Sequence, residues 1–505
     1  MTDPARANLS TYRVFARGAS AVGAATILER GLGFLANVLA ARLGGVQVFG
    51  AYSLALSTAS SVATYAGAGI GATALRFSGT YPPGCPSHRQ YLLALAIVSI
   101  TSAVAAAGVL LPAAKPMARL LLDNAALEPL LQIAAATAAA LILMDCFRNL
   151  LIGQQKFVAL VAFSCLFGTG MLAFLPAAAR LGASWMLVCQ AGLGMLALLL
   201  VIVLVRPLHL ERAQEGSERL GFLLRRLWAF GFLHVASGIG LNLAGWWVLT
   251  LVGRMDSTLT QVAYFSVGMQ LRNIVSMVPG LMGIVSYPLM TDESGQAHGG
   301  AERVTGMATV FAALAGIFIG GAAMAVLPFA LNAYGSAFRG AELPAVMAIG
   351  SAIVHMTVTP AIARLSVVSI RTVALAHLQW AITVAVFGSL FIGSGGAVAA
   401  MAAYVAGHVS SAAIVVLALR RLDAPHRSCL QAVGIAISAA AVLILLGCLR
   451  VTYPAAGLVL SEAIFLAGVV FSLLLLRCGQ MHGWIPQTLN WARLTGADRR
   501  SELQQ

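Results

Sequence analysis

The stretch AVGAATILERGLGFLANVLAAR, residues 21–42, has the apolarity of a transmembrane helix but carries Glu29 and Arg30 near its middle. Between Arg17 and Arg42 the run covers roughly 37 Å at about 1.5 Å per residue, enough to cross a bilayer. Arg30 lies about 20 Å along the helix from Arg17, so its side chain cannot reach water at either end. A charge at that depth costs at least about 2.5 kcal/mol to insert. We therefore predict that it faces a cavity that handles an anion.

The composition is that of a membrane protein, because 60% of the 505 residues are hydrophobic, 10% are charged and the mean hydropathy is +0.89. Apolar runs of about 20 residues between short polar breaks favour helices over a barrel. The net charge of +14 would suggest nucleic-acid binding in a soluble protein. Here the basic residues are scattered over short loops, where membrane proteins collect them, so we expect no nucleic-acid partner. The seven cysteines occur singly and the nine histidines show no metal-ligand spacing, so we expect no metal site. We also expect no resident cofactor.

The apolar runs predict an all-α polytopic protein with about fourteen transmembrane helices. Twelve helices is the alternative, since the breaks at Gly182 and Gly393–Gly396 are weak. The predicted spans are 18–42, 47–72, 91–112, 128–147, 157–179, 183–205, 227–252, 260–288, 304–328, 341–363, 371–392, 396–419, 430–449 and 455–476.

The longest loop, residues 206–226, divides the chain into two six-helix lobes. Its apolar residues Leu220, Phe222 and Leu223 stand beside arginines, which predicts a short interfacial helix on the cytoplasmic face. The predicted domains are an N-terminal lobe (1–205), an interfacial linker (206–226), a C-terminal lobe (227–419), two additional transmembrane helices (420–476) and a cytoplasmic tail (477–505).

A faint internal repeat supports this division. Ala51-Tyr52 aligns with Ala263-Tyr264 at an offset of 212 residues. Arg30 then corresponds to Asn242 in the second lobe, which makes Asn242 a candidate for the same cavity. Paired helical halves with a site near the membrane midplane are the plan of many transporters.

Arginine placement predicts that both termini lie in the cytoplasm. With the N-terminus inside, 22 of the 31 Lys and Arg residues are cytoplasmic, seven lie on the opposite side, and Arg30 and Arg272 are deep in the membrane. Enrichment of basic residues in short cytoplasmic loops orients multi-pass proteins of the inner membrane.

Arg272, like Arg30, is predicted to lie deep in the membrane, because it is about midway between Asp256 and Asp292 in an apolar span. Intramembrane arginines either line a cavity or join helices through ion pairs, and Arg is suited to a bidentate grip on phosphate oxygens. Glu29 is a candidate partner for Arg30 or Arg272, or a group that titrates during transport. We predict a substrate site that contains Arg30, Arg272, Glu29 and Asn242, with no catalytic residue.

Other polar and proline residues within the spans have weaker signals. Pro279 and Pro288 interrupt a helical ladder and predict a gating hinge, with a static kink as the alternative. Trp246-Trp247 is predicted to belong to an interfacial belt rather than to stack on sugars. Histidines 234, 355, 377 and 408 are expected to be hydrogen-bonded packing residues rather than a proton relay.

The sequence resembles the polysaccharide flippases (Wzx type) of the multidrug/oligosaccharidyl-lipid/polysaccharide exporter superfamily. The resemblance is carried by ERGLGFLANVLAARLGG (29–45), VFGAYSLALS (48–57), GAGIGATALRFSG (67–79) and VAYFSVGMQLRNIVSMVPGLMGIVSYPLM (262–290). It implies two helical lobes around a central cavity with alternating access in the bacterial inner membrane. It implies that the substrate is an undecaprenyl-pyrophosphate-linked oligosaccharide for O-antigen or exopolysaccharide synthesis. Polymerase and chain-length proteins are then expected partners, and H+ or Na+ is a possible coupling ion.

The lipid II flippases of the same superfamily are more distant relatives. Arg30 looks like the first of their two helix-1 arginines, but Ala36-Asn37 stands where they have a second Arg followed by Asp. Arg272 looks like their helix-8 arginine.

Two other function classes stay open. A multidrug antiporter of this superfamily would need cavity acids, and Glu29 is the only central one. A membrane polymerase or glycosyltransferase would need a sizeable outer loop with catalytic residues, and the longest predicted outer loops carry no paired carboxylates.

Overall fold

The computed structural model describes residues 4–67, 69–204, 218–291, 300–422 and 427–481. Within these ranges the regular structure is helical and no strand occurs, so the predicted all-α fold is confirmed. A helix satisfies the N–H and C=O groups of its own backbone, which an apolar span needs in a bilayer where water is absent. Ten of the described helical segments are long and apolar enough to cross a membrane by length and composition.

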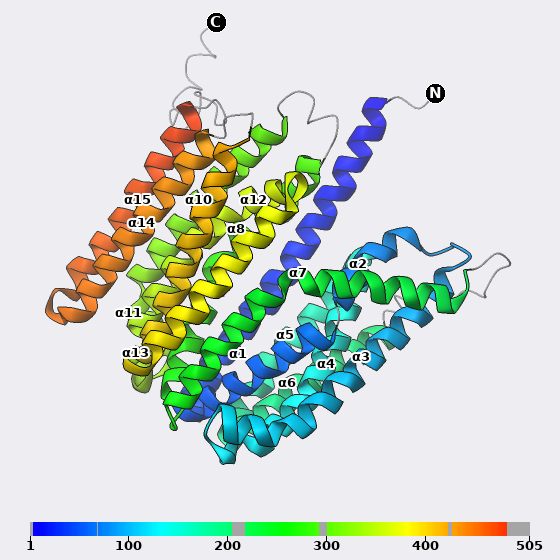
Figure 1. Ribbon diagram of the computed structural model, residues 1–505, viewed down its shortest axis with the longest axis horizontal. Coiled ribbons are helices and arrows are strands. Elements are labelled where there is room, and N and C mark those ends of the chain that lie inside the picture. The colour runs from blue at the N-terminus through cyan, green and yellow to red at the C-terminus, as the bar shows by residue number, and fades with distance from the viewer. Residues whose placement is uncertain (1–3, 68, 205–217, 292–299, 423–426, 482–505) are drawn as a thin grey trace, which may run out of the picture. The chain divides into compact units, whose positions relative to one another are not determined.

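The long helices follow the order of the predicted spans (Figure 1). Their bounds are α1 (Pro4–Ala66), α2 (Ile70–Thr80), α3 (His88–Pro116), α4 (Glu128–Gly153), α5 (Phe157–Leu181), α6 (Ala183–Leu204), α7 (Leu220–Met255), α8 (Thr260–Thr291), α10 (Gly300–Ala325), α11 (Leu327–Tyr334), α12 (Glu342–Val368), α13 (Ile370–Arg420), α14 (Arg427–Thr452) and α15 (Gly457–Met481).

Two of these helices are interrupted by glycines with non-helical backbone angles. Gly45 in α1 has φ 81° and Gly396 in α13 has φ 51°. Both angles fall in the left-handed region that favours glycine, so each position can turn the chain between two helical segments. When α1 and α13 are divided there, and α2 is taken as the end of the second span, the long helices of the described chain correspond one to one with the fourteen predicted spans.

The chain divides into two compact units whose boundaries fall inside α8, α11 and α13 and at the start of α12. Unit 1 takes its residues from 1–270, 329–341 and 381–403, and unit 2 from 271–328, 342–380 and 404–505. The predicted division into two six-helix lobes, two additional helices and a tail stays a prediction.

Each unit is a bundle of packed helices. In unit 1, α1 packs along α5, and α4 contacts α2, α3 and α6. In unit 2, α10, α12, α14 and α15 pack against one another (Figure 1). The helices also carry exposed apolar side chains, such as Val104 on α3 and Leu466 on α15. Apolar side chains on the outside of a bundle are suited to contact with lipid tails.

Residues 220–226, predicted as a short interfacial helix, are the first turns of the longer helix α7. The start of α7 is fixed to the end of α2 through Tyr81, whose hydroxyl donates to Glu218 at 2.8 Å and accepts from Arg226 at 2.9 Å. Burial and the Glu218 carboxylate raise the pKa of Tyr81, so its hydroxyl keeps the proton that it donates. The rest of the predicted linker, residues 206–217, lies outside the described residues.

Candidate functional site

Glu29 forms an ion pair with Arg148 inside unit 1. The Arg148 Nη1 atom lies 3.1 Å from Glu29 Oε1, and Ser164 Oγ donates to the other carboxylate oxygen at 3.1 Å. These three residues come from α4, α1 and α5, so the network joins three helices. Arg148 also lies 3.5 Å from the hydroxyl of Thr26, one turn before Glu29. Both charged side chains are largely buried, with 18% of Glu29 and 26% of Arg148 exposed.

The structure therefore pairs Glu29 with a residue other than the two predicted partners, Arg30 and Arg272. Arg30 follows Glu29 in α1 but points about 100° away around the helix, and its side chain is exposed on unit 1. No described residue forms an ion pair with Arg30. Its positive charge is thus available to a ligand, whereas that of Arg148 is compensated.

Asn242 lies on α7 and is partly buried. Its side-chain oxygen accepts a hydrogen bond from Ser61 Oγ at 3.3 Å, which links α7 to the second half of α1. The two amide hydrogens of Asn242 can still donate to an oxygen-rich ligand. Its predicted role in substrate binding stays a prediction.

Arg272 is held in unit 2 by neutral groups. Its Nε atom donates to Ser351 Oγ on α12 at 3.3 Å, and its Nη2 atom donates to His408 Nε2 on α13 at 3.1 Å. The Ser351 hydroxyl donates its hydrogen to the carbonyl of Ala348, so its oxygen accepts the hydrogen bond from Arg272 through a lone pair. The two hydrogen bonds orient the guanidinium without neutralising it.

Aromatic rings surround the Arg272–His408 contact. The His355 and His408 ring centroids lie 4.5 Å apart, and the Trp380 centroid lies 5.4 Å from that of His408. Tyr404 meets Trp380 edge to face at 5.3 Å. We call Arg272, Ser351, His355, Trp380 and His408 the Arg272 cluster.

Two buried polar atoms near this cluster have no hydrogen-bond partner among the described residues. One is Trp380 Nε1 and the other is Ser276 Oγ, one helical turn after Arg272 on α8. A buried polar atom without a partner costs free energy, and such atoms often mark the place where a ligand or an ordered water binds. The Arg272 cluster therefore offers an excess of hydrogen-bond donors.

Arg450 is a buried arginine that, unlike Arg272, has a carboxylate partner. Arg450 on α14 is 3% exposed, and its Nε atom donates to Glu342 Oε1 at 2.8 Å. Within the described part of the chain, Glu29–Arg148 and Glu342–Arg450 are the ion pairs. Arg272 stands apart from Arg148 and Arg450, because neither of its hydrogen-bond partners carries a negative charge.

The two predicted hinge prolines lie in α8, which continues through both positions. Pro279 is buried, whereas the side chain of Pro288 is outside the described residues. The proposed hinge stays a prediction.

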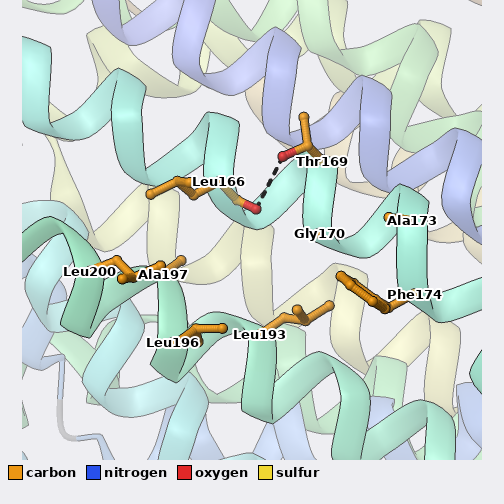
Figure 2. Close-up of a pocket in the computed structure, with 9 residues that line it drawn as sticks. All are labelled: Leu166, Thr169, Gly170, Ala173, Phe174, Leu193, Leu196, Ala197 and Leu200. Carbon is orange, nitrogen blue, oxygen red and sulfur yellow. Dashed lines mark hydrogen bonds between the residues drawn. The ribbon is translucent and has the colours of Figure 1, made fainter.

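A separate groove lies between α5 and α6 in unit 1, with a volume of about 300 Å³. Figure 2 shows that its lining is apolar apart from Thr169, whose hydroxyl is turned toward the backbone of its own helix. That hydroxyl donates to the Cys165 carbonyl at 2.6 Å. The groove therefore offers no free side-chain donor to a phosphate or a sugar.

The comparison of sequences places the chain in a family. The sequence model of the family described as "Polysaccharide biosynthesis protein" matches residues 15–293, more than half of the chain. The chain belongs to this family. A comparison with curated protein sequences gives no match.

Solved structures show which fold this polysaccharide biosynthesis protein has. It is similar to "Lipid II flippase MurJ, inward closed conformation", with a TM-score of 0.60 and 12% identity over 89% of this chain and 96% of that one. It is also similar to an inward-facing multidrug resistance MATE family transporter of the MOP superfamily, with a TM-score of 0.59 and 14% identity over 80% of this chain and 100% of that one. The outward-facing form of a MATE transporter gives 0.54 at 14% identity, over 85% and 96% of the two chains. The predicted MOP-type membrane fold and the resemblance to polysaccharide flippases are confirmed.

Two members of these clusters were missed by sequence reasoning. Arg148 was counted among the cytoplasmic arginines, although Asp145, Arg148 and Asn149 fall within one helical turn and signal a polar face at the end of their span. His408 was expected to be a packing residue. No sequence signal links it to Arg272, because 136 residues separate the two.

Proposed function

We propose that this family member moves an undecaprenyl-pyrophosphate-linked oligosaccharide from the inner to the outer leaflet of the bacterial inner membrane. The product would feed O-antigen or exopolysaccharide synthesis, with polymerase and chain-length proteins as partners. No covalent bond changes, so the protein acts as a flippase rather than an enzyme. Membership in a polysaccharide biosynthesis family and a fold like that of a lipid II flippase support this substrate class.

The uncompensated charge of Arg272 is the main structural support for this function. Arg272 is a partly buried arginine whose hydrogen-bond partners are the neutral residues Ser351 and His408. In a medium of low dielectric constant, an uncompensated guanidinium attracts an anion far more strongly than it would in water. Its planar set of donors matches two phosphate oxygens at once. A pyrophosphate is the anionic part of the proposed substrate.

Arg30 is the proposed second contact for the pyrophosphate, because its charge is exposed on unit 1 and has no ion-pair partner among the described residues. Asn242 would donate to sugar or phosphate oxygens. Glu29 would act indirectly, since its carboxylate is held by Arg148 and Ser164. Alternating access would use bending of α8 at Pro279 and Pro288.

Complementation of a flippase-deficient strain tests the proposal. We expect Arg30→Ala and Arg272→Ala each to abolish glycan export while the protein reaches normal membrane abundance, and Lys at either position to restore export only in part. Lys carries the charge but lacks the bidentate donor geometry. The matched control is Arg371→Ala, which removes an exposed arginine at the start of α13. Full export by the Arg30→Ala/Arg272→Ala double variant would refute the proposed site.

The MATE-like fold favours a second candidate, a cation-coupled multidrug antiporter. Such a transporter exports organic cations, and the uncompensated charge of Arg272 would repel them. An efflux assay with a cationic dye separates the two functions. Dye export that persists in Arg272→Ala would favour the antiporter.

A further inference from the structure

The hydrogen bond between Arg272 and His408 fixes the protonation of the histidine ring. A guanidinium has five N–H donors and no acceptor. His408 Nε2 lies 3.1 Å from Arg272 Nη2, so this ring nitrogen must present its lone pair. His408 is therefore neutral in the described state, with its hydrogen on Nδ1.

The groups that face His408 come from three helices. Arg272 of α8 approaches one ring nitrogen, and the His355 ring of α12 lies tilted against the His408 ring. Trp380 and Tyr404 of α13 also contact the ring. His377 is a further titratable group on α13.

Glu342 is the one acidic residue in the described helices α8, α12 and α13. It begins α12, about 20 Å from His355 along the helix axis. It is already paired with Arg450. A proton added to His408 in this state would therefore stand beside the Arg272 charge, with no carboxylate of the described chain in ion-pair contact.

A bound phosphate anion reverses this balance. An anion that accepts the Nη2 hydrogen now pointing to His408 would leave this ring nitrogen without its donor and beside a negative charge. A protonated His408 would then donate to a phosphate oxygen. A pyrophosphate diester carries two negative charges, and a protonated His408 would add a positive charge beside Arg272 on the unit 2 side of the site.

We propose that His408 takes up one proton when a pyrophosphate diester binds to Arg272. The proton comes from solvent and forms the Nε2–H bond, and no other covalent bond changes. This inference rests on the proposed function, because it takes the substrate anion as the ligand of Arg272. The unpartnered Trp380 Nε1 and Ser276 Oγ supply further donors beside that ligand.

Linkage makes the proposal measurable. If binding takes up one proton, the affinity for the anion rises as the pH falls, by up to tenfold per pH unit over the range of uptake. The anion must not titrate itself. P1,P2-dimethyl pyrophosphate is a suitable probe, because each of its phosphates keeps one negative charge between pH 5 and pH 9, so any pH dependence comes from the protein.

The experiment is calorimetric binding of this diester to the purified full-length protein in lipid nanodiscs, from pH 5.5 to pH 8.5. Measurements in two buffers of different ionisation enthalpy count the protons taken up. We expect uptake approaching one proton for the wild type. For His408→Gln we expect binding without the pH slope, because the Gln oxygen can accept from Arg272 but cannot hold a proton. His377→Gln is the matched control and should keep the slope.

Each outcome bears on a separate claim. A wild type that binds the diester with no proton uptake overturns the inference and leaves the proposed function standing, and this result does not depend on any variant folding. A pH slope that survives in folded His408→Gln overturns the assignment of the proton to His408. A wild type that does not bind the diester at any pH, or binding unchanged in Arg272→Gln, overturns the proposed anion site together with the inference.

Discussion

Glu29 and Arg148 show what a buried ion pair does for a helical membrane protein. Removing both charges from water costs several kcal/mol each, and their attraction repays this only if the remaining hydrogen-bonding capacity is also satisfied. Ser164 and Thr26 supply those additional contacts. The pair therefore works as a fixed joint between α1, α4 and α5, and each charge depends on the other.

We expect Glu29→Gln to lower the amount of folded protein, because it strands the Arg148 charge between helices. Breaking a fully buried pair costs about 3–5 kcal/mol, and the residual exposure of these side chains places the cost at or below the lower end of that range. Quantified membrane abundance and the thermal midpoint in detergent measure it.

A double variant provides the decisive comparison for this pair. Glu29→Gln/Arg148→Gln removes both charges and should recover much of the lost stability. Glu462→Gln is the control, since Glu462 is an exposed carboxylate on α15. Normal abundance of Glu29→Gln with a lost pH response would instead make Glu29 a titrating group of the transport cycle.

Depth in the membrane identified Glu29, Arg30 and Arg272 from the sequence, because a charge far from both ends of an apolar run needs a partner or a cavity. The identity of the partners was not predictable in this way. Arg148 and His408 meet Glu29 and Arg272 through helix packing across 119 and 136 residues. Contacts between residues so far apart in the chain produce no periodic pattern in the sequence.

At the scale of elements, Arg450 ties the last two helices to the rest of unit 2. Its guanidinium reaches Glu342 on α12, the Met324 carbonyl at the end of α10 at 2.7 Å, and Ser461 on α15 at 3.2 Å. A cation near a helix C-terminus also interacts favourably with the helix dipole. One side chain thus contacts three helices besides its own.

We expect Arg450→Gln to destabilise unit 2, because it leaves the Glu342 carboxylate and the α10 carbonyl without their donor. The cost should approach the roughly 3–5 kcal/mol of a broken buried pair. Limited proteolysis and a thermal-shift assay measure it, with Arg420→Gln on the exposed end of α13 as the control. Equal protection of the two variants would show that the contact is dispensable.

For the whole molecule, the arginine distribution predicts orientation. Cys85 between α2 and α3 should face the cytoplasm, whereas Asp256 between α7 and α8 and Gly335 after α11 should face outward. Single-cysteine variants in a cysteine-free background, treated with a membrane-impermeant maleimide, test this arrangement. Labelling from outside at position 85 would contradict it. The corresponding predictions at Gly216 and His426 lie outside the described residues.

The sequence predicted the helices well because a bilayer imposes one strong requirement, that each span satisfies its own backbone. The order and approximate limits of the fourteen spans therefore follow from apolar runs alone. Gly45 and Gly396 divide α1 and α13 at the expected breaks. The grouping into compact units was not visible in the sequence, since most of its boundaries fall within the helices α8, α11 and α13 rather than in loops.

The position of Arg450 also has a consequence for biosynthesis. A ribosome makes the chain from the N-terminus, so Glu342 and the end of α10 enter the membrane more than a hundred residues before their partner exists. Until α14 arrives, that carboxylate must remain hydrated or be shielded by an insertion factor. Unit 2 therefore closes late in translation, and a chain truncated before residue 450 would leave the Glu342 carboxylate without its partner.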